Sequence, residues 1–391
     1  MNGLQSVAAV TITGAFTFGM VIVLLGTLRS VLVERLRLSE DRGDWLLASL
    51  NLTLIPMMLM SGILIDRLGV KSVFLVGSLM TSVAIFLLAI STTGKQTFGA
   101  ILLIGTGAAC LSTGSSVLMT HAFYPEHLAA SQNMGNVFFA LGALLAPSMV
   151  EWLLVRLDFR RGVSLLAVVC LLPAVVAALT ARSAFPEIET PGSLGMVLSD
   201  LRLWLAAAVF FFYGPLERSV EIWAERYLTG LGFGKRGFGW LLAGFWLCFL
   251  GSRLLAAMLE QGSLSSLIAQ GWVIVIASLA AGVILGNLAG ARDRLMSACG
   301  ILALGLVLGP IFPTLVGLLF EYFPTARGTA YGAMFGFGAM GALFLPPILG
   351  SIARRTGVHR TMRVSMMTAL VMTLIAVLLA LFPVISTMAS K

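Results

Sequence analysis

The amino-acid sequence predicts an all-α membrane protein with twelve transmembrane helices in two sets of six. Of its 391 residues, 59% are hydrophobic and only 11% are charged, and the mean hydropathy is +1.00. A soluble domain carries about 25% charged residues, so an ordinary water-facing surface, and with it a soluble enzyme, is excluded. A regular succession of apolar runs and a similarity between the two halves of the chain support the same fold.

Twelve apolar runs are long enough to cross a bilayer, which takes about 20 residues in a helix. Helices are expected because lipid offers no hydrogen-bond partners to an open backbone, and the runs do not alternate as barrel strands do. The first run is too long for the apolar core of a cleavable signal, so it is expected to be retained. The predicted spans are 6–33, 45–65, 72–91, 98–120, 129–152, 163–181, 201–226, 237–258, 265–289, 296–320, 328–350 and 362–385.

The longest interruption of the apolar pattern runs from Arg182 to Asp200 and contains Pro186 and Pro191. Proline together with several polar residues is typical of a linker. The sequence therefore predicts an N-terminal six-helix bundle over 1–182, an interdomain linker over 183–200 and a C-terminal six-helix bundle over 201–391.

The fifth span, with the turn before it, resembles the eleventh at a constant offset of 199 residues. LGALLAP at 141–147 matches MGALFLP at 340–346. The same offset pairs Pro125 with Pro324, Phe138 with Phe337, Ala140 with Ala339 and Gly142 with Gly341. A parallel repeat of six helices is one of the known transporter architectures, although two helices rich in glycine and alanine can also resemble each other by chance.

The turn between the second and third spans reads GILIDRLGVK from Gly62 to Lys71. It resembles the signature loop of the major facilitator superfamily, with Val70 at a position that is usually basic. Gly62 allows a neighbouring helix to approach closely, and Asp66 can pair with the end of a helix. In that family the loop is cytoplasmic and helps to hold one conformation, so the resemblance implies a conformational latch formed by Gly62, Asp66 and Arg67.

The second half is similar to the fucose–galactose–glucose/proton symporter branch of that superfamily. The residues that carry this similarity are Phe211 to Arg218, Trp223, Tyr227, Phe245, Trp246, Gly251 to Arg253, Gly309 to Thr314 and Leu345 to Gly350. The similarity implies proton-coupled transport of a sugar-like solute by alternating access. The sequence departs from the branch because no Asp or Glu lies in 1–33 or in 98–119, where the branch has acidic residues in its first and fourth spans.

Three acids of the seventh span, Glu217, Glu221 and Glu225, are spaced by four residues and share one helix face. Ionisable residues inside a membrane are costly and usually functional. One hypothesis is that Glu217 takes up the coupling proton and that Glu221 or Arg218 tunes it. The alternative is a structural ion pair between Glu217 and Arg218. Pro215 weakens the helix nearby and frees backbone groups that can line a cavity.

Several polar and amphipathic side chains are candidates for solute contact. Amides both donate and accept hydrogen bonds and therefore suit a hydroxyl-rich solute, whereas hydrogen bonding between helices is the alternative role. The predicted substrate-binding residues are Asn133, Asn136, Gln132, Tyr213, Arg218, Trp246 and Asn51. The small hydroxyl residues Ser112, Thr113, Ser115 and Ser116 are weaker candidates.

Basic residues conflict with the topology that the signature loop implies. With that loop inside, only Arg67, Lys71, Arg182, Arg202, Arg253, Arg327 and Lys391 count as cytoplasmic. Most other basic residues, including Arg354, Arg355, Arg360 and Arg363, then lie outside, against the positive-inside rule. The orientation therefore stays open. An outer field of positive charge also suggests a second function, the transport of organic anions or amphiphiles.

The sequence contains no phosphate-binding loop, nucleophile elbow or metal-ligand spacing, so neither an enzyme nor a cofactor or metal is expected. Cys110, Cys170, Cys248 and Cys299 lie in apolar runs at spacings that match no metal or redox motif. The expected partners are a small-molecule substrate, a coupling proton and the lipid bilayer of the plasma (inner) membrane. Nucleic acid is not an expected partner, and the chain is expected to be a monomer. A membrane receptor that does not transport remains a further alternative.

Overall fold

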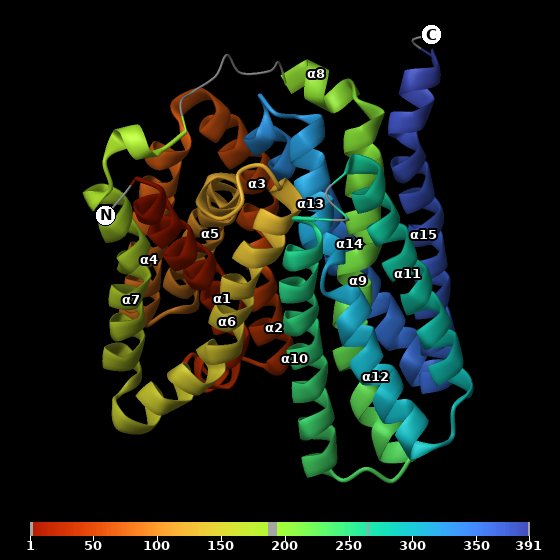
Figure 1. Cartoon of the computed structure of the whole chain (residues 1–391). Coiled ribbons are helices and arrows are strands. Elements are labelled where there is room, and N and C mark those ends of the chain that lie inside the picture. The colour runs from red at the N-terminus through yellow and green to blue at the C-terminus, as the bar shows by residue number, and fades with distance from the viewer. Residues whose placement is uncertain (1–2, 187–193, 263, 265, 390–391) are drawn as a thin grey trace. The chain divides into compact units, whose positions relative to one another are not determined.

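The structure, a computed structural model, describes residues 3–186, 194–262, 264 and 266–389 (Figure 1). Every regular element in these ranges is a helix. The elements are α1 (Gly3–Arg35), α2 (Glu40–Ala48), α3 (Leu50–Leu68), α4 (Val70–Ile90), α5 (Gly94–Ala122), α6 (Leu128–Arg156), α7 (Phe159–Leu179), the 3-10 helix η1 (Arg182–Ala184), α8 (Leu194–Ser199), α9 (Leu201–Gly230), α10 (Lys235–Leu259), α11 (Leu267–Gly290), α12 (Arg294–Leu308), α13 (Ile311–Tyr322), α14 (Arg327–Thr356) and α15 (Val358–Ala389).

The predicted all-α membrane fold is confirmed. Within the described part of the chain, 11 helical segments are long and apolar enough to cross a membrane. The predicted seventh span coincides with α9, which has 30 residues. Two predicted spans are formed by broken helices. The second consists of α2 and α3, which meet at Ser49, and the tenth consists of α12 and α13, which are separated by Gly309 and Pro310.

The break between α12 and α13 lies at Gly309 and Pro310, and Pro313 leaves the carbonyl of Gly309 without its helical partner. Proline has no backbone N–H, so Pro313 cannot donate to the carbonyl of Gly309 four residues earlier. Gly309 is required because a Cβ there would overlap Ser252 Oγ and the carbonyl oxygen of Phe249. The carbonyl of Gly309 is therefore available to a side chain from another helix.

The chain forms two compact units, which do not follow the order of the sequence. Unit 1 comprises residues 1–125, 135–197 and 324–336, and unit 2 comprises 126–134, 198–323 and 337–391. The start of α6 thus belongs to unit 2 and the start of α14 to unit 1. These two segments are related by the 199-residue offset found in the sequence. The predicted boundaries at 182 and 201 remain a prediction, and residues 187–193 of the predicted linker lie outside the described residues.

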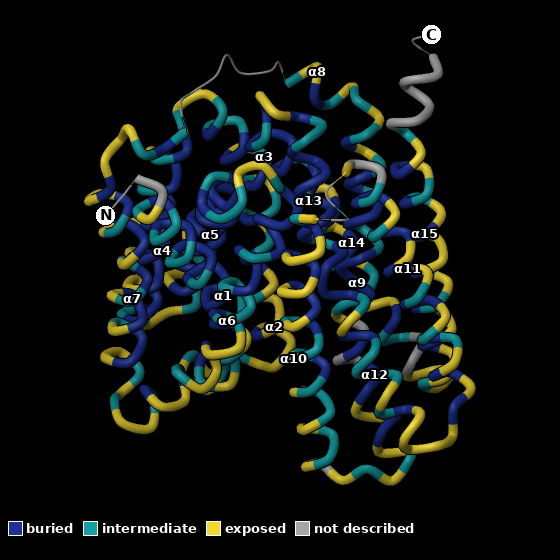
Figure 2. The backbone as a smooth tube through the Cα atoms, in the orientation of Figure 1, coloured by how far each residue is buried: buried dark blue, intermediate teal, exposed yellow. Residues whose placement is uncertain are grey.

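In unit 1, α5 packs against α1, α3 and α4 and is buried along most of its length (Figure 2). Its glycines permit this packing. A Cβ on Gly105 would overlap Leu50 of α3, and one on Gly107 would overlap Thr81 of α4. Ser61 and Thr113 share a hydrogen bond of 2.9 Å between α3 and α5. The hydroxyl of Thr113 therefore joins α5 to α3, which is the alternative role considered for the small polar residues of α5.

In unit 2, α15 packs against α11 and α9, and α10 packs against α12. A Cβ on Gly341 of α14 would overlap the carbonyl oxygen of Phe211 on α9. Its repeat counterpart in unit 1, Gly142 of α6, faces the carbonyl oxygen of Phe16 on α1 in the same manner. The two glycines matched in the sequence therefore have the same packing role.

Candidate functional site

The end of α3 contacts the start of α14 inside unit 1, through what we term the Asp66 contact (Gly62, Asp66, Gly328 and Thr329). Asp66 Oδ1 accepts a hydrogen bond of 2.9 Å from the backbone N–H of Gly328, and Oδ2 accepts one of 2.7 Å from Thr329. The first N–H groups of a helix have no partner within it and carry a partial positive charge. A carboxylate here therefore satisfies two donors at once.

Close approach of the two backbones makes the Asp66 contact possible. A Cβ on Gly62 would overlap the carbonyl oxygen of Gly328. Arg67, the third residue of the predicted latch, is exposed. The structure thus brings Gly62 and Asp66 together against α14 and leaves Arg67 on the surface.

A second carboxylate, Glu260, lies at the C-terminal end of α10 and is only 1% exposed. Asn133 Nδ2 donates to Glu260 Oε2 at 2.8 Å, and Thr314 Oγ1 donates to Oε1 at 2.6 Å. Asn133 Nδ2 also lies 3.0 Å from Thr314 Oγ1, to which it donates. These three residues, all in unit 2, form what we term the Glu260 contact, and they close a triangle of hydrogen bonds around one buried carboxylate.

Burial raises the pKa of Glu260 to about 7, because a buried carboxylate loses its hydration. Hydrogen bonds from Thr314 and Asn133 act in the opposite direction, and the charge of Glu321 raises the pKa further. Glu260 therefore titrates in the physiological range, where an ordinary glutamate is fully ionised.

A third set, the Arg253 cluster (Tyr213, Glu217, Trp246, Phe249 and Arg253), joins α9 and α10 in unit 2. The buried Tyr213 hydroxyl interacts with both the Glu217 carboxyl group and the Arg253 guanidinium. Arg253 is 3% exposed, and its Nε donates to the freed carbonyl of Gly309 at 3.0 Å. A buried cation and a half-buried acid thus share one tyrosine.

Aromatic rings surround this cluster. The Arg253 guanidinium lies 4.4 Å above the Phe249 ring, which contacts Trp246 edge-on at 5.3 Å between centroids. On the other side, Tyr213 stacks with Phe312 at 6.4 Å. Two predicted substrate-binding residues, Tyr213 and Trp246, therefore lie in the same cluster.

The structure does not bring the other predicted site residues into the Arg253 cluster. Asn133 belongs to the Glu260 contact, and Gln132 is buried beside it in the sequence. Asn136 Nδ2 lies 3.9 Å from Met119 Sδ in unit 1. Asn51 donates to the carbonyl of Ala48 in its own chain segment. Arg218 is exposed, and the side chain of Glu221 lies outside the described residues.

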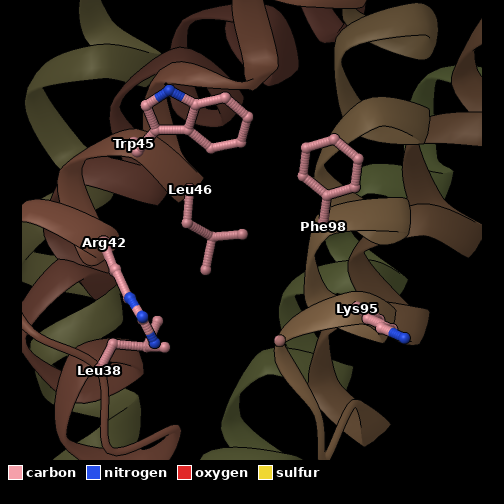
Figure 3. A pocket seen from close by; sticks show the side chains of 7 residues that line it. Leu38, Arg42, Trp45, Leu46, Lys95 and Phe98 are labelled. Carbon is pink, nitrogen blue, oxygen red and sulfur yellow. The ribbon is translucent and has the colours of Figure 1, made fainter.

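A pocket of about 340 Å³ in unit 1 is lined by the segment before α2, by α2 and by the start of α5. Trp45 and Phe98 face each other across it with nearly parallel rings, 6.2 Å apart (Figure 3). Arg42 and Lys95 contribute two cations to an otherwise apolar lining. The pocket suits a molecule that combines negative charge with apolar surface.

Comparison with known proteins identifies the family. A sequence model described as Major Facilitator Superfamily matches residues 9–346. The chain belongs to this superfamily. Among curated protein sequences, none matches the chain significantly.

Three solved structures of transporters resemble the superfamily fold of this chain. The human organic anion transporter MFSD10 is 14% identical with a TM-score of 0.75, over 96% of this chain and 100% of that one. The E. coli fucose:proton symporter FucP is 14% identical with a TM-score of 0.74, over 96% and 99%. The proton:xylose symporter XylE is 13% identical with a TM-score of 0.76, over 95% and 94%. At these identities the likeness shows the fold alone.

Two charged residues of these sites, Arg253 and Glu260, are not predicted as functional from the sequence. Arg253 was counted with the loop residues although it lies inside the predicted span 237–258, and the structure buries it in α10. An arginine within a predicted span is itself a signal of function. Glu260 follows the predicted end of that span by two residues. Nothing local distinguishes it from a solvated turn residue, because its partners are 54 and 127 residues away.

Proposed function

We propose that this superfamily member is a proton-coupled secondary transporter of a small hydroxylated, sugar-like solute that works by alternating access between two six-helix bundles. The observation that supports the proposal most directly is the arrangement of Glu217 and Arg253 around the buried Tyr213. The fold likeness to two sugar–proton symporters is consistent with it.

Coupling follows from charge competition inside the cluster. While Glu217 is ionised, its negative charge and the positive charge of Arg253 balance each other across the Tyr213 hydroxyl. When Glu217 takes up a proton, the guanidinium and the phenol become available to oxygen atoms of a solute. Solute binding and proton binding therefore favour each other, which is the requirement for symport.

The cluster also offers both surfaces that a sugar needs. Polar groups of Tyr213, Glu217 and Arg253 can bind hydroxyls, while the rings of Trp246 and Phe312 provide an apolar wall. Solute contacts from Asn133, Asn136, Gln132, Asn51 and Arg218, and a proton role for Glu221, remain predictions.

Uptake by proteoliposomes that contain a pH-sensitive dye tests the proposal. Addition of the transported sugar from a panel should change the internal pH in wild type. Glu217→Gln should reduce this proton movement at least about tenfold while retaining counterflow of labelled sugar. Glu225→Gln is the matched control, because Glu225 lies two turns further along the same helix and is exposed. If the wild-type protein showed no counterflow, it would be a receptor. Normal coupling in Glu217→Gln would refute the proton role.

Transport of an organic anion is the second candidate, supported by the buried cation Arg253 and by the apolar pocket that carries Arg42 and Lys95. Arg253→Lys should then retain binding of a labelled carboxylate, and Arg253→Gln should lose it. For a sugar, the two variants should be impaired alike, because the lysine cannot reproduce the planar donors of the guanidinium.

A further inference from the structure

Glu260 differs from the acid of the proposed transport mechanism in both position and partners. It lies seven residues after Arg253, two helical turns further along α10. Its carboxyl group contacts Asn133 and Thr314 and has no direct part in the Arg253 cluster. A buried acid with two neutral donors and no cation partner is costly in its ionised form.

Asn133 comes from a short segment that belongs to unit 2, although most of its helix does not. Residues 126–134 comprise the two residues before α6 and its first turns, while the remainder of that helix belongs to unit 1. A Cβ on Gly317 of α13 would overlap the backbone of Ala129, so this segment lies directly against α13. Glu260 and Thr314 are the side chains of unit 2 that bind Asn133 there.

We propose that Glu260 is a proton-binding site whose occupancy fastens residues 126–134 to the rest of unit 2. The protonated, neutral carboxyl group keeps the segment attached, whereas the ionised group favours a detached state in which water reaches the carboxylate. The proton comes from solvent and forms an O–H bond on one carboxyl oxygen. This site is separate from Glu217 and does not depend on the proposed coupling there.

Asn133 has the chemistry to hold the neutral form as well. Its Oδ1 is buried and has no hydrogen-bond partner among the described residues. A protonated Glu260 carries one O–H donor. A turn of the amide presents Oδ1 to this donor, so that protonation adds a partner for the one acceptor of Asn133 that lacks one.

The charged surroundings of Glu260 act in the same direction. From α13, Glu321 repels the ionised form. From α11, Gln270 Nε2 donates to Glu321 Oε1 at 3.2 Å and adds no charge. The start of α6 contributes the neutral Asn133, and on α10 itself Arg253 is bound to the carbonyl of Gly309. The described contacts thus give Glu260 no compensating cation.

The pKa gives the range and sign of the effect. The pKa of Glu260 is about 7 in the attached state, against 4.5 for a hydrated glutamate, so the attached state binds the proton more tightly. Attachment is therefore favoured at acidic pH and weakens as pH rises towards and through 7. The difference of about 2.5 pK units limits the shift in the equilibrium to roughly 300-fold.

Hydrogen–deuterium exchange of the full-length protein in lipid nanodiscs tests this, with rates corrected for the chemical effect of pH. Between about pH 5.5 and about pH 8.5, the amides of 128–134 should lose at least about tenfold protection in wild type. Glu260→Gln, which is neutral at every pH, should remove this dependence. If Glu260→Gln removes the pH dependence of protection but retains normal uptake coupling, this site is separate from Glu217.

Two further variants keep the proposal testable if Glu260→Gln folds poorly. Glu321→Gln removes a repelling charge and should move the midpoint to lower pH. Thr314→Val removes a donor to the carboxylate and should move it to higher pH. A flat wild-type profile, or the same profile in Glu260→Gln and wild type, or midpoints that do not move in the other two variants, would overturn the proposal.

Discussion

The Asp66 contact and the Glu260 contact solve one structural problem in two ways. Each joins the end of one helix to the first turns of another, and those turns are the segments that the two units exchange. Asp66 accepts from two backbone N–H groups at 2.9 and 2.7 Å. Glu260 accepts from an amide and a hydroxyl side chain at 2.8 and 2.6 Å. The geometry is similar, but the donors are different.

Backbone and side-chain donors give the two carboxylates different surroundings. Asp66 is half-buried and faces the positive end of α14, where a negative charge is favourable. Glu260 is buried, and its donors carry no helix dipole or formal charge to compensate for lost hydration. The two contacts show that a carboxylate can hold the first turns of a helix either through the backbone N–H groups of that helix or through neutral side chains.

Both contacts depend on close backbone approach at a glycine, and this gives the largest predicted effect. Gly62→Val and Gly317→Val each place a side chain against backbone atoms, of Gly328 and Ala129 respectively, that cannot move aside. We expect each variant to lose about 3 kcal/mol or more of stability, measured as thermal unfolding in detergent. Gly251→Ala is the control, since open space surrounds a Cβ there. A tolerated valine at either glycine would show that its segment is not held by packing.

The second prediction concerns the pH dependence of the Glu260 contact. Because the pKa of Glu260 is raised to about 7, its contribution to stability is present at low pH and is lost as pH rises through 7. Thr314→Val removes a donor to the charged form. It should therefore destabilise the protein by about 1.5–3 kcal/mol near pH 8 and by less near pH 5.5.

Thr373→Val provides the matched control for that comparison. Thr373 is also a buried threonine of unit 2, but its hydroxyl donates to the carbonyl of Ala369 in its own helix. The loss in this variant should be the same at both pH values. An equal pH dependence in the two threonine variants would contradict the assignment of the titration to Glu260.

Sequence reasoning found the Asp66 contact but not the Glu260 contact, and the reason is physical. Gly62 and Asp66 form part of a continuous motif, so ten neighbouring residues predicted the turn and the pairing of Asp66 with a helix end. Glu260 acquires its properties only from burial beside Asn133 and Thr314, which local sequence does not encode. Helix positions followed from hydropathy because the bilayer imposes length and composition on every span. The exchange of 126–134 and 324–336 depends on packing between distant helices, which the pattern of spans does not specify.

A smaller effect is expected from neutralising the Asp66 contact. Asp66→Asn keeps one acceptor oxygen, but its NH₂ group then faces a backbone N–H of the 328–329 pair. The loss should be about 1–2 kcal/mol near pH 7, measured as before. Asp41→Asn is the control, because Asp41 is an exposed acid in the first turn of α2. An equally small effect in both variants would mean that the helix N-terminus adds nothing specific to the signature-loop contact.

The smallest predicted effect concerns a hydrogen bond that also holds the exchanged segment 324–336 of unit 1. Tyr331, in the exchanged segment 324–336, shares a hydrogen bond of 2.9 Å with Ser112 of α5. Tyr331→Phe should cost about 0.5–1.5 kcal/mol, and a double-mutant cycle with Ser112→Ala should return part of it as coupling, because the Tyr331 hydroxyl also interacts with Ser116. It should also speed deuterium exchange at 328–334. Tyr227→Phe breaks a similar bond of 2.7 Å to Ser297, away from both exchanged segments, and should leave those amides unchanged. If Tyr331→Phe left exchange at 328–334 unaltered, the hydrogen bond of Tyr331 would have no part in holding the segment.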